Sequence, residues 1–311
     1  MNGNIYDIRD SIEEFVSHYE ALIKGALRFL LAFITLSVVN GKLGYMDRLN
    51  SAGIVFAVSL LCALLPPGVI IFFAAVFTVL HCYALSIEAA FIMIVVFLLM
   101  FLLYFRFTPK DTLAVLLTPL SFVFRIPYVM PIVYGLKGSP LSALSVGFGT
   151  AAYFIIDYIA DSESVIKGMA EATTVERFRT ILDGVLKNPE MIAYIIAFAF
   201  TVVVVNIIKR LSFKNSWTVA ICAGAAVNII LLMILSLRLN ADINIGALIL
   251  GSVIAIIIAF IYKLFVFSVD YAKTERLQFE DDGYVYYVKA VPKIKSHRRR
   301  RGSAPRPRDD D

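Results

Sequence analysis

Long, uninterrupted apolar runs are the feature that most constrains the fold of this 311-residue chain. Several of them exceed the roughly 18 residues that indicate a transmembrane helix. A soluble domain is about 45–50% apolar, whereas 59% of this chain is hydrophobic. The runs do not alternate apolar with polar residues, which argues against a β-barrel. The sequence therefore predicts an all-α polytopic membrane protein.

Seven runs are long enough to be read as spans, and an eighth is shorter. The seven cover about residues 21–39, 69–85, 87–107, 141–160, 191–208, 216–237 and 244–267. The shorter run, 52–65, is divided from 69–85 by Pro66, Pro67 and Gly68, which break a helix. If residues 52–65 cross fully, there are eight spans and the N-terminus is cytoplasmic. If they only dip into the bilayer, there are seven spans and the N-terminus is outside.

Polar segments divide the rest of the chain. Residues 1–24 have the spacing of an amphipathic helix and show no cleavable signal peptide, and 25–267 form the transmembrane domain. Within it, the polar segment 161–190 predicts two short amphipathic helices. A cytoplasmic hairpin at 268–294 and a basic, disordered tail at 295–311 complete the expected organisation.

Basic residues near short loops predict the orientation in the cytoplasmic membrane. The loop "KRLSFKN" and the basic C-terminal tail are separated by two spans, so both are expected inside. Counting backward places residues 161–190 outside, and Lys110 and Lys137 inside. Both flanks of the apolar stretch 111–136 then lie on one side. That stretch is therefore expected to be a re-entrant hairpin or a pair of short helices.

The stretch "FRIPYVMPIVYG", Phe124–Gly135, holds a charge and two prolines in an apolar setting. Irregular backbone survives at membrane depth only where protein or a water-filled cavity satisfies it, and paired interrupted helices indicate transporter sites. Two interpretations stay open: a kink or interfacial helix pair with Arg125 reaching the headgroups, or a substrate or ion path. The residues that we assign to such a path are Arg125, Pro127, Pro131, Pro66, Pro67, Gly68, Asp157 and Asn228.

Two predicted spans carry small residues at every fourth position, which lets membrane helices approach closely. One stripe is Ala143, Gly147 and Ala151; the other is Ala247, Gly251, Ala255 and Ala259. Two interpretations of these stripes stay open: helix packing within the monomer, and a contact between subunits of an oligomer. Asn228 is expected to form a hydrogen bond across helices.

The sequence does not indicate an enzyme. It has no HExxH, GxSxG or Walker A motif and no Cys/His cluster. Cys62, Cys82 and Cys222 lie in or beside apolar runs without CxxC spacing, so neither a zinc site nor a disulfide framework is expected. We expect no metal and no cofactor.

The tail sequence "RLQFEDDGYVYYVKAVPKI" predicts a β-hairpin, because Asp282-Gly283 is a strong turn signal between strand formers. An isolated hairpin is only marginally stable, so it is expected to dock on another surface or chain. The docking residues are Phe279, Asp282, Gly283, Tyr284, Tyr286 and Tyr287. Arg298, Arg299, Arg300 and Arg301 are expected to attract anionic lipid headgroups. No nucleic-acid partner is expected.

The segments "FRIPYVMPIVYGL" and "FSVDYAKTERLQFEDDGYVYYVKAVPKI", with the order of spans, resemble a group of multi-pass membrane proteins of anaerobic Gram-positive bacteria. Those proteins are often labelled ABC transporter permeases. The resemblance implies a permease-like subunit, and an ATPase would be a separate partner because the chain shows no nucleotide-binding segment. The alternative function is a membrane scaffold that recruits cytoplasmic partners through its tail and moves no solute.

Overall fold

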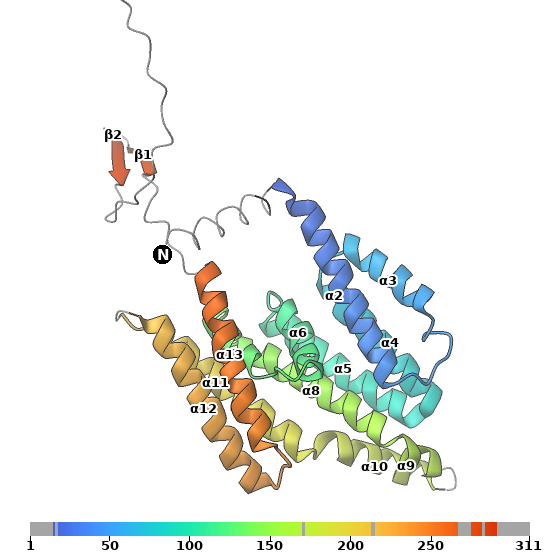
Figure 1. The fold of residues 1–311 in the computed structure, drawn as a ribbon. Coiled ribbons are helices and arrows are strands. Elements are labelled where there is room, and N and C mark those ends of the chain that lie inside the picture. Colours follow the sequence, from blue (N-terminus) through green and yellow to red (C-terminus); the bar gives the residue numbers. More distant parts are fainter. Residues whose placement is uncertain are drawn as a thin grey trace, which may run out of the picture. The chain divides into compact units, whose positions relative to one another are not determined.

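The computed structural model describes Phe15 and residues 18–169, 172–212, 215–266, 275–281 and 284–290. Seven helical segments within these residues are long and apolar enough to cross a membrane. They contain α2 (Glu20–Lys42), α4 (Gly68–Leu85), α5 (Ile87–Phe107), α8 (Ser142–Asp161), α11 (Pro189–Lys209), α12 (Ser216–Leu239) and α13 (Ile245–Val266), as Figure 1 shows. Their bounds differ from the expected spans by a few residues. The prediction of a multi-pass helical membrane protein is confirmed.

Local sequence signals explain where several of these helices begin. Ser86 caps α5, because its hydroxyl accepts a hydrogen bond from the Ala89 N–H. Asn188 caps α11 by accepting from the N–H groups of Glu190 and Met191, and Pro189 follows at the first helical position, where it needs no donor. The helix α10 (Thr174–Leu186) begins with a capping box between Thr173 and Glu176. With α9 (Glu163–Gly168), it forms the expected pair of short helices.

The helix α3 (Ala52–Leu64) has 13 residues and is about 20 Å long, which is short of the roughly 30 Å hydrocarbon core. It nevertheless runs back along α2. Near its beginning, Asn40 Nδ2 donates to the Leu49 carbonyl at 2.6 Å; just past its end, Arg28 Nη1 donates to the Leu65 carbonyl at 3.4 Å. The chain therefore returns toward the beginning of α2 before α4 starts. This path is that of the eight-span alternative, although α3 is shorter than a membrane span.

Polar contacts between helix ends sort those ends into two groups. The Lys42 end is defined by the contact of Lys42 with Asp157 and that of Arg177 with Glu88. The Lys209 end is defined by the hydrogen bonds of Lys209 to Gly138, of Ser142 to Asp111 and of Lys263 to Thr218. The beginning of α2 lies at the opposite end of that helix from Lys42, and Lys263 lies in the last turn of α13, so both of these helix ends belong to the Lys209 end.

The stretch between α5 and α8 consists of two short helices, α6 (Thr112–Val123) and α7 (Val129–Lys137). Its two flanks meet at the Lys209 end. Ser142 Oγ donates to Asp111 Oδ2 at 2.6 Å, and Ser145 Oγ donates to Thr108 Oγ1 at 2.7 Å. Residues 107–138 therefore do not run as one continuous crossing. The chain enters and leaves this stretch at one place.

The break between α6 and α7 is a Schellman motif built on Arg125. The N–H of Arg125 donates to the Phe122 carbonyl at 3.0 Å, and the N–H of Ile126 donates to the Ser121 carbonyl at 2.8 Å. Arg125 has a φ of 60°, in the left-handed region that usually takes glycine. The helix α6 thus ends at Val123, four residues before Pro127, which cannot continue the ladder.

Two glycines allow close contacts with the α6–α7 stretch, one on α8 and one on α13. A Cβ added to Gly149 of α8 would lie 2.6 Å from Thr118 Cβ and 3.0 Å from the Val115 carbonyl oxygen of α6. Because Pro119 has no N–H, it cannot donate to the Val115 carbonyl, and the hydrogen-bond ladder of α6 is interrupted there. Gly149 has no side chain, which lets α8 approach α6 closely at this interruption. On α13, a Cβ at Gly251 would lie 2.6 Å from the Tyr128 ring beside the break.

Two strands follow the helices, β1 (Glu275–Asp281) and β2 (Tyr284–Ala290). They pair antiparallel, with Glu275 opposite Ala290 and Asp281 opposite Tyr284. The turn residues Asp282 and Gly283 and the basic residues Arg298–Arg301 lie outside the described residues. Docking by Phe279, Tyr284, Tyr286 and Tyr287 stays a prediction, as does the hairpin itself.

Candidate functional site

A cavity of about 100 Å³ lies between α2, α4, α5, α6 and α8. Most of its lining is apolar or aromatic, and charged side chains enter it from Lys42 and Asp157 alone among the residues that line it. The lining includes Lys42 of α2, Phe97 and Tyr104 of α5, Pro119 of α6, and Phe148, Ala152, Tyr153 and Asp157 of α8. An apolar pocket with a few convergent polar groups is the usual form of a small-molecule site.

The cavity is elongated along the helices. On α8, its lining extends from Phe148 to Asp157, which is about 14 Å of helix. Lys42 and Asp157 lie at one extreme, at the Lys42 end. Tyr104 lies toward the opposite end, where its hydroxyl donates to the Pro109 carbonyl at 3.0 Å and shares a 2.6 Å hydrogen bond with Thr112. The site is therefore a slot with a charged end and an apolar body.

The charged end is an ion pair supported by an aromatic face. The Lys42 ammonium forms an ion pair and hydrogen bond with Asp157 Oδ1, and its nitrogen lies 5.8 Å from the centroid of the Tyr153 ring. The side chains are partly open, 38% exposed for Lys42 and 27% for Asp157. The ammonium is held by a carboxylate and a π-face together, which are the two groups that recognise organic cations.

Helix geometry places these groups. Tyr153 and Asp157 are four residues apart on α8 and so lie on one face. Asp161, one turn further, is close enough to act electrostatically on Lys42. Lys42 is the last residue of α2 and reaches α8 across the end of the bundle. One carboxylate thus contacts the ammonium and a second acts on it electrostatically, so the charge balance at this end of the cavity is negative.

A second polar cluster holds the α2–α3 loop against α4. His81 is fully buried; its Nδ1 accepts from the Met46 N–H at 3.1 Å, and its Nε2 lies 2.9 Å from Asn40 Oδ1. Because the backbone N–H can only donate, Nδ1 is the acceptor and Nε2 carries the proton. His81 lies inside α4, where Asn40 and Met46 supply the partners that burial requires. In the same loop, burial raises the pKa of Tyr45 to about 12.

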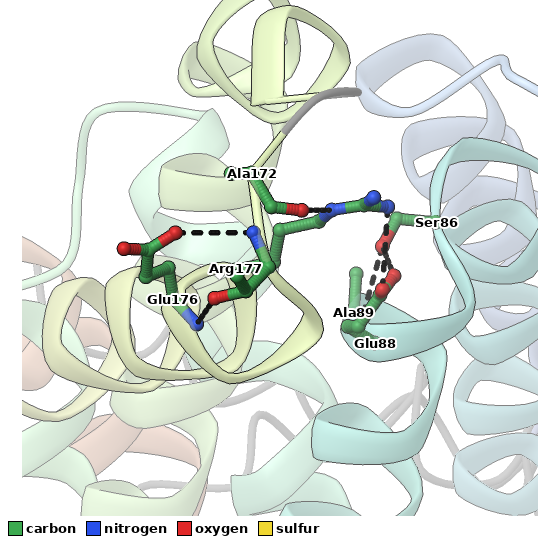
Figure 2. A network of polar contacts seen from close by, with 7 residues as sticks. Ser86, Glu88, Ala89, Ala172, Glu176 and Arg177 are labelled. Atoms are coloured by element: carbon green, nitrogen blue, oxygen red, sulfur yellow. Dashed lines mark hydrogen bonds and ion pairs between the residues drawn. The ribbon is translucent and has the colours of Figure 1, made fainter.

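Figure 2 shows how α10 is tied to the first turn of α5. Arg177 Nη1 lies 3.4 Å from Glu88 Oε1, and Arg177 Nε donates to the Ala172 carbonyl at 3.2 Å. Ser86 Oγ donates to Glu88 Oε2 at 2.6 Å, so it fixes the carboxylate as well as capping the helix. These contacts hold a surface helix against the spans, and their residues do not line the cavity.

The structure separates the residues that we assigned to one path. Asp157 lines the cavity, whereas Pro66, Pro67, Gly68, Arg125, Pro127, Pro131 and Asn228 do not. The Arg125 side chain is exposed at the α6–α7 break, and Pro127 and Pro131 are buried beside it. Asn228 is fully buried, yet its side-chain nitrogen and oxygen have no hydrogen-bond partner among the described residues. The expected hydrogen bond of Asn228 across helices is therefore wrong for this structure.

The small-residue stripes occupy different surroundings. Gly251, Ala255 and Ala259 are buried on α13, whereas Ala247 is exposed. On α8, Ala143 and Ala151 are half-buried, and a Cβ at Gly147 would make an ordinary 3.7 Å contact with Ile195. Of the two glycines on α8, the closer approach is at Gly149, outside the predicted stripe.

Lys42, Tyr153 and Pro119 belong to the site, and sequence reasoning missed them. The spacing of Tyr153 and Asp157 was a signal that could have found part of the site, since an aromatic ring four residues before a carboxylate shares its helix face. Lys42 carried no such signal, because it is 115 residues from Asp157 in the sequence. Within the described residues, no group of three or more His, Cys, Asp or Glu side chains could hold a metal ion.

Comparison with protein families, with curated proteins and with solved structures finds no match for this chain. Its class therefore follows from the fold alone: it is a multi-pass α-helical membrane protein.

Proposed function

We propose that this chain is a permease-like integral membrane subunit that moves a small solute through the cavity between α2, α4, α5, α6 and α8. The observation that carries the proposal is the position of α6, the first helix of the broken pair α6–α7, which forms one wall of that cavity as far as Val123, just before the break. Interrupted helices at a binding cavity are how membrane transporters bring backbone and side chains to a solute. A separate ATPase subunit or another cytoplasmic partner would supply the coupling.

In this proposal, α6 and α7 form a re-entrant element. The hydrogen bonds from Ser142 to Asp111 and from Ser145 to Thr108 support it, because they join the entry of the stretch to its exit. The final turn of α7 is tied down as well. Lys209 Nζ donates to the carbonyls of Leu136 and Gly138, at 2.7 and 2.9 Å, and so satisfies carbonyls that the helix leaves free.

We place the Lys209 end in the cytoplasm. The short loop after α11 carries Lys209 and Arg210 without a carboxylate, and the basic C-terminal tail follows α13. The short loop after α12, at the opposite end, contains Asp242. This difference favours a cytoplasmic Lys209 end by the positive-inside rule. The charged end of the cavity would then face outward.

Accessibility of the cavity from both sides of the membrane tests transport. Ala152 lines the cavity and is small enough to be replaced by cysteine, in a chain whose exposed Cys222 is changed to serine. A transporter that alternates between two openings should let a membrane-impermeant maleimide reach Ala152→Cys in intact cells and, separately, in inverted vesicles. Ile155→Cys is the matched control, because Ile155 is buried on the same helix and does not line the cavity.

The outcome separates the two candidate functions. Labelling of Ala152→Cys from both sides, with none at Ile155→Cys, supports transport. Labelling from one side alone in every condition contradicts it and favours the scaffold, for which deletion of residues 273–311 should abolish recovery of partner proteins while the spans stay inserted.

A further inference from the structure

The charged end of the cavity already holds an organic cation, which is the ammonium group of Lys42. Its position is defined by Asp157, through an ion pair, and by the Tyr153 ring, whose centroid is 5.8 Å away. This ammonium is tethered to the last residue of α2 and is 38% exposed, so it can leave without unfolding a core. A ligand ammonium could take the same place against the same two groups.

The charge balance favours a cation over an anion in that place. Asp157 contacts Lys42, and Asp161, one turn further along α8, acts on the same ammonium electrostatically, so displacement of the lysine leaves Asp157 unpaired in the field of a second carboxylate. An anionic head would have to displace Asp157 from Lys42 and then lie close to Asp161, and like charges at such distances repel. A cationic head meets attraction from both carboxylates and from the ring.

The body of the slot indicates what the cation is attached to. Below the charged end, the lining is formed by apolar and aromatic side chains, among them Phe97, Ala152, Ile156 and Phe148. Such a surface gains free energy by covering an apolar chain, by roughly 25 cal/mol per Å² removed from water. Its extent of about 14 Å along α8 suits an extended chain better than a compact polar solute.

We propose that the cavity binds amphipathic amines and quaternary ammonium compounds, whose cationic head replaces Lys42 at Asp157 and Tyr153 while the apolar chain fills the slot. That these compounds are transported rests on the proposed function, but their binding to the cavity can be measured without transport.

The test is protection of Ala152→Cys from a membrane-permeant maleimide in protein reconstituted in nanodiscs. Decyltrimethylammonium should slow the labelling, and decyl sulfate, which has the same chain and the opposite charge, should not. Both probes enter the bilayer, so the native Cys222, which is exposed on α12 and outside the cavity, serves as an internal control in each sample. Mass spectrometry of the two peptides reports both rates.

Two variants make the result specific to the charged end. Asp157→Asn should raise the decyltrimethylammonium concentration needed for half-protection by roughly tenfold, because it removes the charge partner. Lys42→Met should lower that concentration, because it removes the competing ammonium, and a merely structural ion pair would not give this opposite sign. Circular dichroism of each variant verifies that it is folded.

Equal protection by both probes, or no change in Asp157→Asn, overturns the proposal. The results remain distinguishable from failure of the proposed function. Protection by the cation, with labelling of Ala152→Cys from one side of the membrane alone, would mean a binding protein that does not transport. Labelling from both sides without cation protection would mean a transporter for another class of solute.

Discussion

Ser142 Oγ donates a 2.6 Å hydrogen bond to Asp111 Oδ2, and this contact joins the residue before α6 to the first residue of α8. The 30 residues between them contain both short helices and the Arg125 break. Because Ser142 also accepts from the Ser139 N–H at 3.1 Å, the same hydroxyl fixes the turn after α7. One serine therefore closes the stretch that we propose to be re-entrant.

Loss of this closure should destabilise the protein. Asp111→Ala and Ser142→Ala should each lower the free energy of unfolding by about 1–3 kcal/mol, as expected for a hydrogen bond to a charged group. The double variant should lose much less than the sum of the two, because they remove one shared interaction. Thermal unfolding of purified protein measures all three. Additive losses would show that the two residues act independently.

The two groups of helix ends predict the topology. A cysteine at Ser212, beyond α11, should be protected from an impermeant maleimide in intact cells, whereas one at Ser162, beyond α8, should react. A cysteine at Asn50, in the loop before α3, should behave like Ser162, because that loop belongs to the Lys42 end. Reaction at Ser212 with none at Ser162 would reverse the orientation that we propose.

Close packing between α6 and α8 depends on Gly149. Gly149→Ala should cost about 1–3 kcal/mol of stability, because its Cβ would lie 2.6 Å from Thr118 Cβ, within a tightly packed contact. Gly41→Ala, in α2, is the matched control: a Cβ there has nothing within 4 Å, so this change should be neutral or slightly stabilising. Melting temperatures in detergent compare the two, and an equal effect would rule out the packing explanation.

Asn228 should be dispensable for folding. Its amide is fully buried without a partner among the described residues, and an unsatisfied buried polar group costs about 1–3 kcal/mol. Asn228→Leu, which keeps the same branched arrangement of four side-chain heavy atoms, should therefore keep or raise the melting temperature. A clear drop would indicate that the amide binds a water molecule or a solute in the native protein.

The Arg125 break should tolerate glycine better than any other residue. Arg125→Gly should raise stability by about 1 kcal/mol, because it removes the strain of a side chain at a φ of 60°. Arg125→Ala keeps the Cβ and should leave stability nearly unchanged, so this pair of variants separates backbone strain from the loss of the charge. If both variants lose stability equally, the guanidinium group itself holds the break.

The class of protein and the approximate bounds of its long helices could be predicted from the sequence. Apolar runs of membrane length predict spans because each backbone group must be satisfied within its own helix in lipid. Ser86, Asn188 and Thr173 mark helix starts through local hydrogen bonds to residues two or three positions away. Pro66 and Pro127 mark breaks for the same local reason, since proline has no N–H to donate.

The set of residues that share a site depends on the tertiary packing and could not be predicted from local sequence. Arg125, Asn228 and Asp157 looked alike in the sequence, as polar residues within apolar runs, yet the fold places one on the surface, one in the core and one in a cavity. Lys42 and Asp157 meet because α2 and α8 end at the same side of the bundle. Such a contact depends on helix directions and packing over 115 residues of chain, and no local pattern records it.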